Sequence, residues 1–285
     1  MELEEIADYA CDTGEGPLWH PVEKALYWLD IHSGRIFRYN PNTGSHSTIH
    51  EGEPLGGMTI EADGSLLLFQ RSGIINKWTG DSIEVVNDEL KEEPQYQFND
   101  VIADPMGRVF CGTLATEDSV GKLYRLDTDG SIEAVYEGVE TSNGLGFSPD
   151  YDTLYFTESR KQRISEFGYD VGTGAISNRR TFVETPEDGG LPDGMTVDKQ
   201  GGVWSAQCYG GHVVRYSKDG SVERRIDLPV TKVTSLIHGG PSYRDLYVTT
   251  GGGQNKKEQG DKAGTLFRFE TEVSGRPEHF SRITI

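Results

Sequence analysis

The chain has 285 residues, of which 46 are acidic and 27 basic, and its formal net charge is −19. Such a charge disfavours binding to nucleic acid or to an anionic membrane surface, because both require a positive field. No apolar run approaches the roughly 18 residues of a membrane-spanning helix. The N-terminal segment MELEEIADY lacks the basic and apolar regions of a secretory signal.

The acidic residues are spread along the chain instead of forming a tail. An ordinary solvated surface explains this pattern, and adaptation to high salt is the alternative hypothesis. Adaptation predicts an activity optimum at molar KCl, and an optimum in dilute buffer would contradict it.

Three cysteines, Cys11, Cys111 and Cys208, are scattered without the CxxC spacing of a metal or redox site. We expect each to be a reduced, buried thiol that behaves as a small hydrophobic residue. This usage predicts a cytoplasmic protein.

The predicted elements are short β-branched or aromatic runs, and no amphipathic segment has the length of a helix. In chain order the most apolar runs are LYWLDI (26–31), LLLFQR (66–71), RVFCGT (108–113), LYFTES (154–159), GVWSAQ (202–207) and DLYVTT (245–250). Each follows a shorter apolar strand and a Pro, Gly or Asp turn. A third strand follows each of them: RIFRY (35–39), IINKW (74–78), KLYRL (122–126), RISEF (163–167), HVVRY (212–216) and TLFRF (265–269).

The segments DGMTVDKQGGVWSAQ (193–207) and GGMTIEADGSLLLFQ (56–70) match almost position for position, and four further segments fit the same frame. With fourth strands such as HSTIH (46–50) and RTFVE (180–184), the chain contains six units of four antiparallel strands at a spacing of about 41–50 residues. This pattern predicts an all-β, six-bladed β-propeller forming a single domain over residues 1–285, with a β-sandwich as the alternative. The segment LEEIADY (3–9) precedes the first unit and is predicted to close the ring as the outer strand of the last blade.

The first residues of the six inner strands should form a ring at one mouth of the central channel, because equivalent repeat positions surround the axis. These residues are Glu15, Gly56, Asn99, Asn143, Asp193 and Thr234. Small neighbours such as Gly16, Gly144 and Gly194 are expected to allow a tight chain entry that turns the preceding side chain inward.

Two carboxylates and two amides that meet in a channel need a cation or water between them. Their oxygen ligands favour Ca²⁺, Mg²⁺ or Mn²⁺, with Zn²⁺ and Fe²⁺ as further candidates for one divalent metal site. A water-filled, hydrogen-bonded channel is the alternative. The loop TGGGQNKKEQGDKAG (250–264) is predicted to be a flexible insertion near the mouth that either covers the site or is simply solvated.

At these positions the sequence resembles the SMP-30/gluconolactonase/regucalcin family of six-bladed propellers. The matching motifs include GEGPLW (14–19), FND (98–100), SNGLGFS (142–148) and PDGMTVD (192–198). The resemblance implies that Glu15, Asn143 and Asp193 hold a divalent metal and that Asp193 is also the proton donor and acceptor. It further implies that Asn99 contacts the substrate, with metal contact as an alternative, and that Glu117 is a substrate contact.

The activity implied by the resemblance is hydrolysis of a sugar lactone, such as a pentono- or gluconolactone, to its aldonic acid. One departure concerns Gln97, because many lactonases of this family have arginine there. Glutamine can still hydrogen-bond sugar hydroxyls but supplies no positive charge, so the identity of the lactone is the open point.

Two other functions are compatible with the same residues. One is hydrolysis of phosphotriesters or other esters at an oxygen-ligated metal, and the other is a non-enzymatic, calcium-binding propeller. The partner expected in the first reading is a small sugar lactone, bound by a monomer or a weak homo-oligomer.

Overall fold

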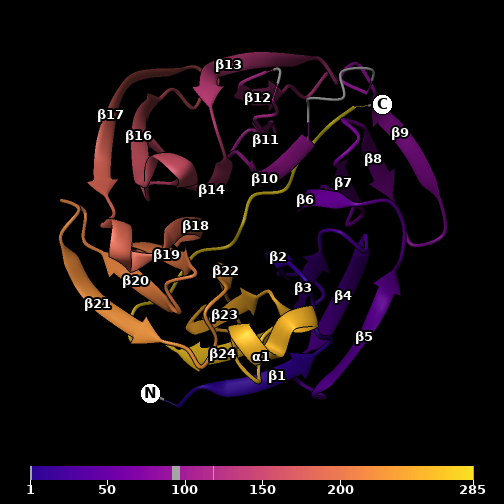
Figure 1. Cartoon of the computed structure of the whole chain (residues 1–285). Coiled ribbons are helices and arrows are strands. Elements are labelled where there is room, and N and C mark those ends of the chain that lie inside the picture. Colours follow the sequence, from indigo (N-terminus) through magenta and orange to yellow (C-terminus); the bar gives the residue numbers. More distant parts are fainter. Residues whose placement is uncertain (1, 92–96, 118, 285) are drawn as a thin grey trace.

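The computed structural model describes residues 2–91, 97–117 and 119–284, which form six four-stranded antiparallel sheets around a central axis (Figure 1). The predicted six-bladed β-propeller is therefore confirmed. Within five blades the strands follow chain order from the axis outward. No helix in the described part of the chain is long and apolar enough to cross a membrane.

The first three blades contain strands β2 to β13. Blade 1 comprises β2 (Gly14–His20), β3 (Ala25–Asp30), β4 (Arg35–Asn40) and β5 (Ser45–His50). Blade 2 comprises β6 (Leu55–Ile60), β7 (Leu66–Gln70), β8 (Ile75–Trp78) and β9 (Ile83–Asn87). Blade 3 comprises β10 (Gln97–Ala103), β11 (Val109–Leu114), β12 (Gly121–Leu126) and β13 (Ile132–Val139).

The last three blades contain the remaining strands. Blade 4 comprises β14 (Ser142–Phe147), β15 (Thr153–Glu158), β16 (Arg163–Tyr169) and β17 (Ile176–Glu184). Blade 5 comprises β18 (Leu191–Val197), β19 (Val203–Cys208), β20 (His212–Tyr216) and β21 (Val222–Asp227). Blade 6 comprises β22 (Val233–Gly239), β23 (Asp245–Thr250), β24 (Thr265–Glu270) and β1 (Glu4–Asp8). Short helices are η1 (Ser159–Lys161), η2 (Glu187–Gly189), η3 (Gly253–Asn255) and α1 (Lys256–Gln259).

The circle of six blades is closed by the N-terminal strand, as the sequence predicts. β1 pairs antiparallel with β24, with Glu4 opposite Arg268 and Asp8 opposite Thr265. Arg268 also pairs with Glu4 at 2.9 Å. Because β1 supplies the outer strand of a blade whose other strands come from the C-terminal part of the chain, the first and last units hold each other in place.

The hydrophobic core is divided among the interfaces between neighbouring blades. In the described residues each pair of adjacent blades shares one buried cluster. Leu145 of blade 4, for example, packs in the same cluster as Phe110 of blade 3. All six residues of β3 are buried, whereas no residue of the outer strand β5 is. This difference in burial explains why β3 has an apolar sequence and β5 a polar one.

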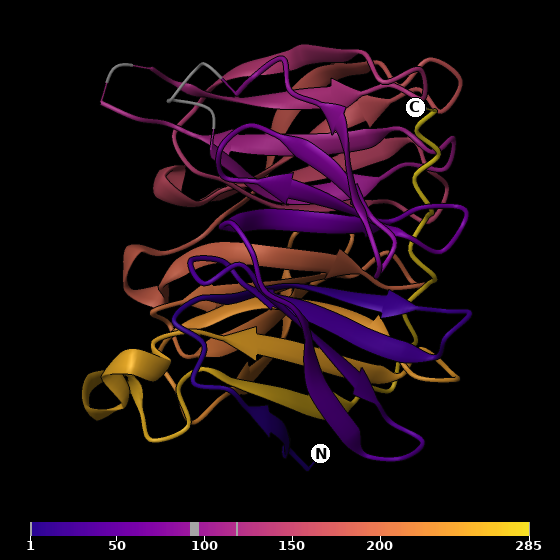
Figure 2. The ribbon, with the colours of Figure 1, turned by 90° about the vertical axis from the view of Figure 1, so that its right-hand side faces the viewer.

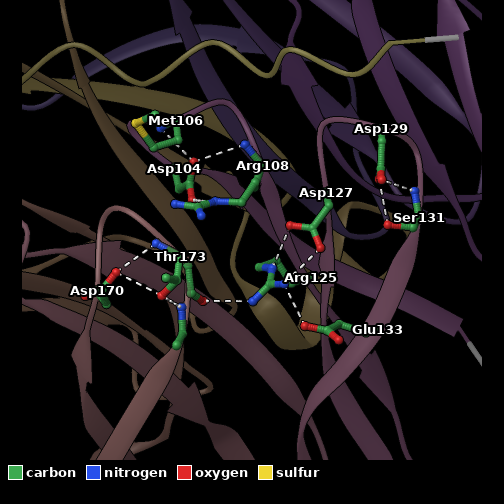
Figure 3. Close-up of polar contacts among 12 residues, drawn as sticks. Asp104, Met106, Arg108, Arg125, Asp127, Asp129, Ser131, Glu133, Asp170 and Thr173 are labelled. Carbon is green, nitrogen blue, oxygen red and sulfur yellow. Dashed lines mark hydrogen bonds and ion pairs between the residues drawn. The ribbon is translucent and has the colours of Figure 1, made fainter.

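Arg108 and Arg125 of blade 3 donate hydrogen bonds to the loop between β16 and β17 of blade 4. Figure 3 shows both arginines with the acidic side chains of blade 3 that they pair with. The buried Arg108 pairs with Asp104 at 2.5 Å and donates to the carbonyl oxygen of Val171. Arg125 donates to the carbonyl oxygen of Gly174 at 3.2 Å. These contacts add polar connections beside the buried apolar cluster that the two blades share.

The C-terminal segment 271–284 crosses one face of the propeller, on the side opposite α1 (Figure 2). Its described residues hydrogen-bond to several blades: Ser281 to Ile60 at 2.8 Å, Arg282 to Gly107 at 2.9 Å, and Arg276 to Phe147 at 2.7 Å. Four of its residues line the end of a narrow central tunnel: Arg276, Pro277, Glu278 and His279. The segment therefore covers this end of the tunnel.

The carboxyl group of Glu278 in this segment is expected to make the stability of the protein depend on pH. Burial raises its pKa from 4.5 to about 7, although the Arg276 charge opposes the shift. A folded pKa above the unfolded value means that the stability is complete below about pH 4.5 and is lost as the pH rises through 7. We expect Glu278→Gln to raise the free energy of unfolding by about 2 kcal/mol at pH 8 and by much less at pH 5.

Denaturant unfolding at the two pH values measures this difference. Glu272→Gln is the matched control, because Glu272 lies in the same segment with a side chain that is 81% exposed. A gain for Glu278→Gln that is equal at both pH values, or a loss at pH 8, would contradict the prediction.

Candidate functional site

The ring residues lie where the inner strands break their regular pairing. The register shifts between Glu15 and Leu18 in β2, and between Pro192 and Met195 in β18. Equivalent shifts occur in β10, β14, β6 and β22. Such β-bulges turn side chains away from the sheet alternation, and here they coincide with the ring that the repeat frame predicts.

Gly144 lies at a close approach between two blades. The Asn143-Gly144 dipeptide lies inside β14 and is not a hairpin turn. A Cβ on Gly144 would lie 2.5 Å from the backbone nitrogen of Met195 and 2.7 Å from the carbonyl oxygen of Asp193. The glycine is therefore required because the inner strands of blades 4 and 5 approach closely at the ring. Gly16, by contrast, has a positive φ of 51°, as expected of a tight chain entry.

Two ring amides are joined in a chain of hydrogen bonds. Asn99 Nδ2 donates to Asn143 Oδ1 at 2.8 Å, and Asn143 Nδ2 donates to Ser159 Oγ at 2.8 Å. At the other end, Arg71 Nη2 donates to Asn99 Oδ1 at 3.1 Å. Both amides are buried, so their orientations are fixed by partners on three blades. The Asn143 oxygen keeps a second lone pair for another ligand.

Three carboxylates lie close together beside these amides. Burial raises the pKa of Glu15 well above its usual value, and the charges of Asp193 and Asp100 raise it further. Burial and the Asp100 charge raise the pKa of Asp193 in the same way. Burial also raises the pKa of Asp100 to about 7. Lys232 partly opposes the shifts of Glu15 and Asp193.

This arrangement has the properties of a site for a hard divalent cation. Glu15 and Asp193 are buried carboxylates that repel each other, and Asn143 adds a neutral oxygen. A cation between them would relieve both the repulsion and the cost of burial. Within residues 2–91, 97–117 and 119–284, no three His, Cys, Asp or Glu side chains form a metal-binding group by themselves. The candidate set therefore needs the amide as its third ligand.

A cleft of about 1390 Å³ opens at the ring end of the channel. Asn143, Asp193 and Glu117 all line it, together with Glu140, Glu187, Arg160 and Lys161. Glu117 is exposed at this mouth. Gln97 lies on blade 3, where its Oε1 accepts a hydrogen bond from Arg71 Nη1 at 3.1 Å. The structure thus brings Glu15, Asn99, Asn143 and Asp193 together, with Glu117 at the rim and Gln97 beside Arg71.

The η1 helix, which carries Ser159, is held by a buried ion cluster. Glu158 is 1% exposed and pairs with Arg163 at 2.7 Å, with Lys161 at 3.1 Å and with Arg179 at 3.2 Å. Burial alone would raise the pKa of Glu158, but hydrogen bonds from Arg163, Ser165 and Lys161 outweigh it and hold the pKa at about 2. This cluster fixes the partner of the Asn143 amide.

Four residues around this ring are not among the predicted site residues: Arg71, Ser159, Cys208 and Lys232, of which Lys232 acts on Glu15 and Asp193 through its charge. Arg71 and Ser159 each directly follow the second strand of their blade, so a repeat alignment extended by one residue identifies them. Cys208 hydrogen-bonds to Asp193, although the prediction that all three cysteines are free and buried is confirmed. Lys232 Nζ donates to Thr13 Oγ1 at 3.0 Å.

The insertion after β23 is more ordered than its glycine-rich sequence suggests. It forms η3 and α1, and Lys256 Nζ pairs with Asp8 Oδ2 at 2.6 Å. Gln254 Nε2 donates to the carbonyl oxygen of Ala10 at 3.2 Å. The insertion packs against the segment around β1. The described residues that line the cleft come from blades 3 to 5 and include none of this insertion.

Comparison with known proteins places these features in a family. The model of the SMP-30/gluconolactonase/LRE-like region matches residues 13–252. The chain is 47% identical to pentonolactonase XacC of Haloferax volcanii over the full length of both proteins. It is 30% identical to regucalcin of Xenopus laevis over 94% of each chain. The solved structure of a luciferin-regenerating enzyme superposes with a TM-score of 0.91, at 27% identity and 99% coverage of both chains.

Proposed function

Because the chain belongs to the SMP-30/gluconolactonase/LRE-like family, we propose that it is a metal-dependent lactonase that hydrolyses a sugar lactone to the aldonic acid. A pentono- or gluconolactone is the expected substrate, and the pentonolactone is favoured by the 47% identity to a pentonolactonase. The observation that carries the proposal is the convergence of Glu15, Asn143 and Asp193 at one mouth of the channel.

Glu15, Asn143 and Asp193 would hold one divalent cation, for which their oxygen atoms favour Ca²⁺, Mg²⁺ or Mn²⁺. Zn²⁺ and Fe²⁺ remain candidates to be tested. When bound, the cation would act as a Lewis acid that stabilises negative charge on the lactone carbonyl oxygen.

Asp193 moves the proton in the proposed reaction. Its carboxylate takes a proton from the water that attacks the lactone carbonyl carbon, and the ring C–O bond then breaks. The same carboxyl returns the proton to the departing ring oxygen, which becomes a hydroxyl group of the aldonic acid. The buried position of Asp193 suits this role, because burial raises its affinity for a proton. Glu117 is the alternative proton acceptor, since a metal lowers the basicity of its ligands.

Three side chains orient the sugar hydroxyls in this proposal. Asn99 and Gln97 lie on one wall of the ring, and Glu117 lies at the rim of the cleft. Several hydrogen bonds from fixed groups hold the lactone carbonyl near Asp193 and the attacking water.

The decisive experiment uses the whole protein, stripped of metal and reconstituted with one cation at a time. Acid release from a panel of aldonolactones is followed by pH-stat at controlled KCl concentration. We expect no turnover without metal, and restoration by one or more of the five candidate cations. Turnover of the metal-free protein equal to that of the reconstituted protein would contradict the proposal.

The same panel separates the alternatives. Faster hydrolysis of phosphotriesters or aryl esters than of any lactone would identify a different hydrolase. Tight metal binding without turnover of any ester would identify a non-enzymatic, metal-binding propeller.

The three free, buried cysteines agree with the proposed cytoplasmic location. A monomer or weak homo-oligomer is proposed, and light scattering of the holoprotein measures this state directly.

A further inference from the structure

Blade 2 contributes to the ring in a different way from its neighbours. Its ring residue is Gly56, and a Cβ at this position would lie 2.0 Å from the carbonyl oxygen of Phe98. The inner strand of blade 2 therefore has no room for a ring side chain. The same blade supplies Arg71 instead, directly after β7, and the backbone nitrogen of Arg71 is fixed by the carbonyl oxygen of Pro54 at 2.9 Å.

The guanidinium of Arg71 spans two residues of β10. Nη1 donates to Gln97 Oε1 and Nη2 donates to Asn99 Oδ1, each at 3.1 Å. Arginine suits this position because its planar fork presents two donors in a fixed geometry, whereas a lysine ammonium concentrates its charge at one point. Gln97 and Asn99 are the residues that orient sugar hydroxyls in the proposed function.

These two hydrogen bonds determine what each amide presents to a substrate. Because Arg71 donates to Gln97 Oε1, the orientation of this amide is fixed, and Gln97 presents to a ligand its NH₂ donor and the second lone pair of Oε1. Asn99 uses its NH₂ on Asn143 Oδ1 and on the Ser142 carbonyl oxygen, both at 2.8 Å. Its remaining capacity is the second lone pair of Oδ1, an acceptor. The wall therefore combines the NH₂ donor of Gln97 with acceptor oxygens on both amides, which matches a hydroxyl-bearing ring.

Arg71 also places positive charge on the wall beside Gln97. Burial lowers its pKa from the usual 12.5, and the nearby Glu15 charge opposes this shift. The guanidinium therefore stays charged at neutral pH. The positive charge that Gln97 does not supply is provided by the neighbouring blade.

We propose that Arg71 is a positioning residue that makes the site selective for hydroxylated lactones by fixing the amides of Gln97 and Asn99. This inference rests on the proposed lactonase function. A site whose polar groups are held ready for substrate hydroxyls discriminates strongly against an analogue without them, because those groups then remain unpaired.

The test compares a pentonolactone with γ-butyrolactone, which has the lactone group but no hydroxyls, in the reconstituted holoprotein. We expect Arg71→Met to raise the KM for the pentonolactone about tenfold, with kcat within about threefold, and to reduce the preference over γ-butyrolactone about tenfold. Arg71→Lys should be intermediate. Arg38→Met is the matched control, because Arg38 pairs with Glu23 at 2.9 Å on blade 1.

A double variant that exchanges the residues at positions 71 and 97 tests whether pentonolactone binding can be restored. Gln97→Arg alone places two guanidinium groups side by side and should weaken pentonolactone binding, whereas Arg71→Gln combined with Gln97→Arg should restore the KM to within about threefold of the wild type. An unchanged preference in Arg71→Met, or a double variant no better than Arg71→Met, would overturn the inference. Failure of the wild type to hydrolyse any lactone would instead reject the lactonase function itself.

Discussion

Asp193→Asn is expected to lower kcat about a thousandfold, while the variant still binds the activating cation. Asparagine keeps an oxygen atom in the ring but cannot accept the proton of the attacking water. The loss should appear in kcat, because the proton is transferred only in the transition state. Single-turnover kinetics of the reconstituted variant, with calorimetric titration of the cation, measure the two quantities separately.

Asp100→Asn is the matched control for this variant. Asp100 lies near Asp193 and shares its buried, acidic surroundings, but it has no role in the proposed proton transfer. We expect it to lose less than about tenfold in kcat. Near-wild-type turnover of Asp193→Asn would remove Asp193 as the base and transfer that role to Glu117. Loss of cation binding together with turnover would leave Asp193 as a metal ligand only.

Glu15→Gln is expected to have opposite effects on the two forms of the protein. Without metal, Glu15 is 4% exposed and lies beside Asp193 and Asp100. Removing one of these mutually repelling carboxylates should raise the free energy of unfolding of the metal-free protein by about 1–2 kcal/mol. The variant should also lose most of the stabilisation that the cation gives, which is about 2.7 kcal/mol at a concentration of 100 Kd.

Thermal unfolding with and without saturating cation measures both effects. Glu117→Gln is the matched control for metal binding, because Glu117 lies exposed at the rim, outside the proposed ligand set. It should retain the full metal-dependent rise in Tm. If the cation raised the Tm of Glu15→Gln as much as that of the wild type, Glu15 would not be a ligand.

The fold and the ring were accessible from the sequence because both depend on periodicity. Glu15, Asn99, Asn143 and Asp193 occupy one column of the repeat, and a propeller converts such a column into a ring. The closing strand β1 followed from the repeat frame, since residues 3–9 precede the first unit and were free to join the last blade. These inferences needed no knowledge of individual side-chain positions.

The contacts between blades were not accessible in this way. Arg71 meets Gln97 and Asn99 only because blade 2 packs against blade 3, and Ser159 meets Asn143 only because η1 turns back toward the ring. The bulges were also missed, because one extra residue in a short strand barely changes its apolar pattern. Gly144 was predicted as a tight chain entry, but its close approach to the backbone of blade 5 could not be predicted from the repeat alone.

The C-terminal segment has a further consequence for how the channel exchanges molecules. Because Arg276, Pro277, Glu278 and His279 line the far end of the tunnel, the C-terminal segment covers that end, and the wide opening is the cleft at the ring. The incoming lactone and the outgoing aldonate are therefore expected to pass through the same cleft, and each product is expected to leave before the next substrate binds. The lactone is neutral, whereas the aldonate is an anion. The cleft is lined by Glu117, Glu140 and Glu187. Arg160 and Lys161 also line the cleft, but the three glutamates outnumber these two cations. We therefore expect the net charge of the cleft to favour departure of the anionic aldonate over that of the neutral lactone.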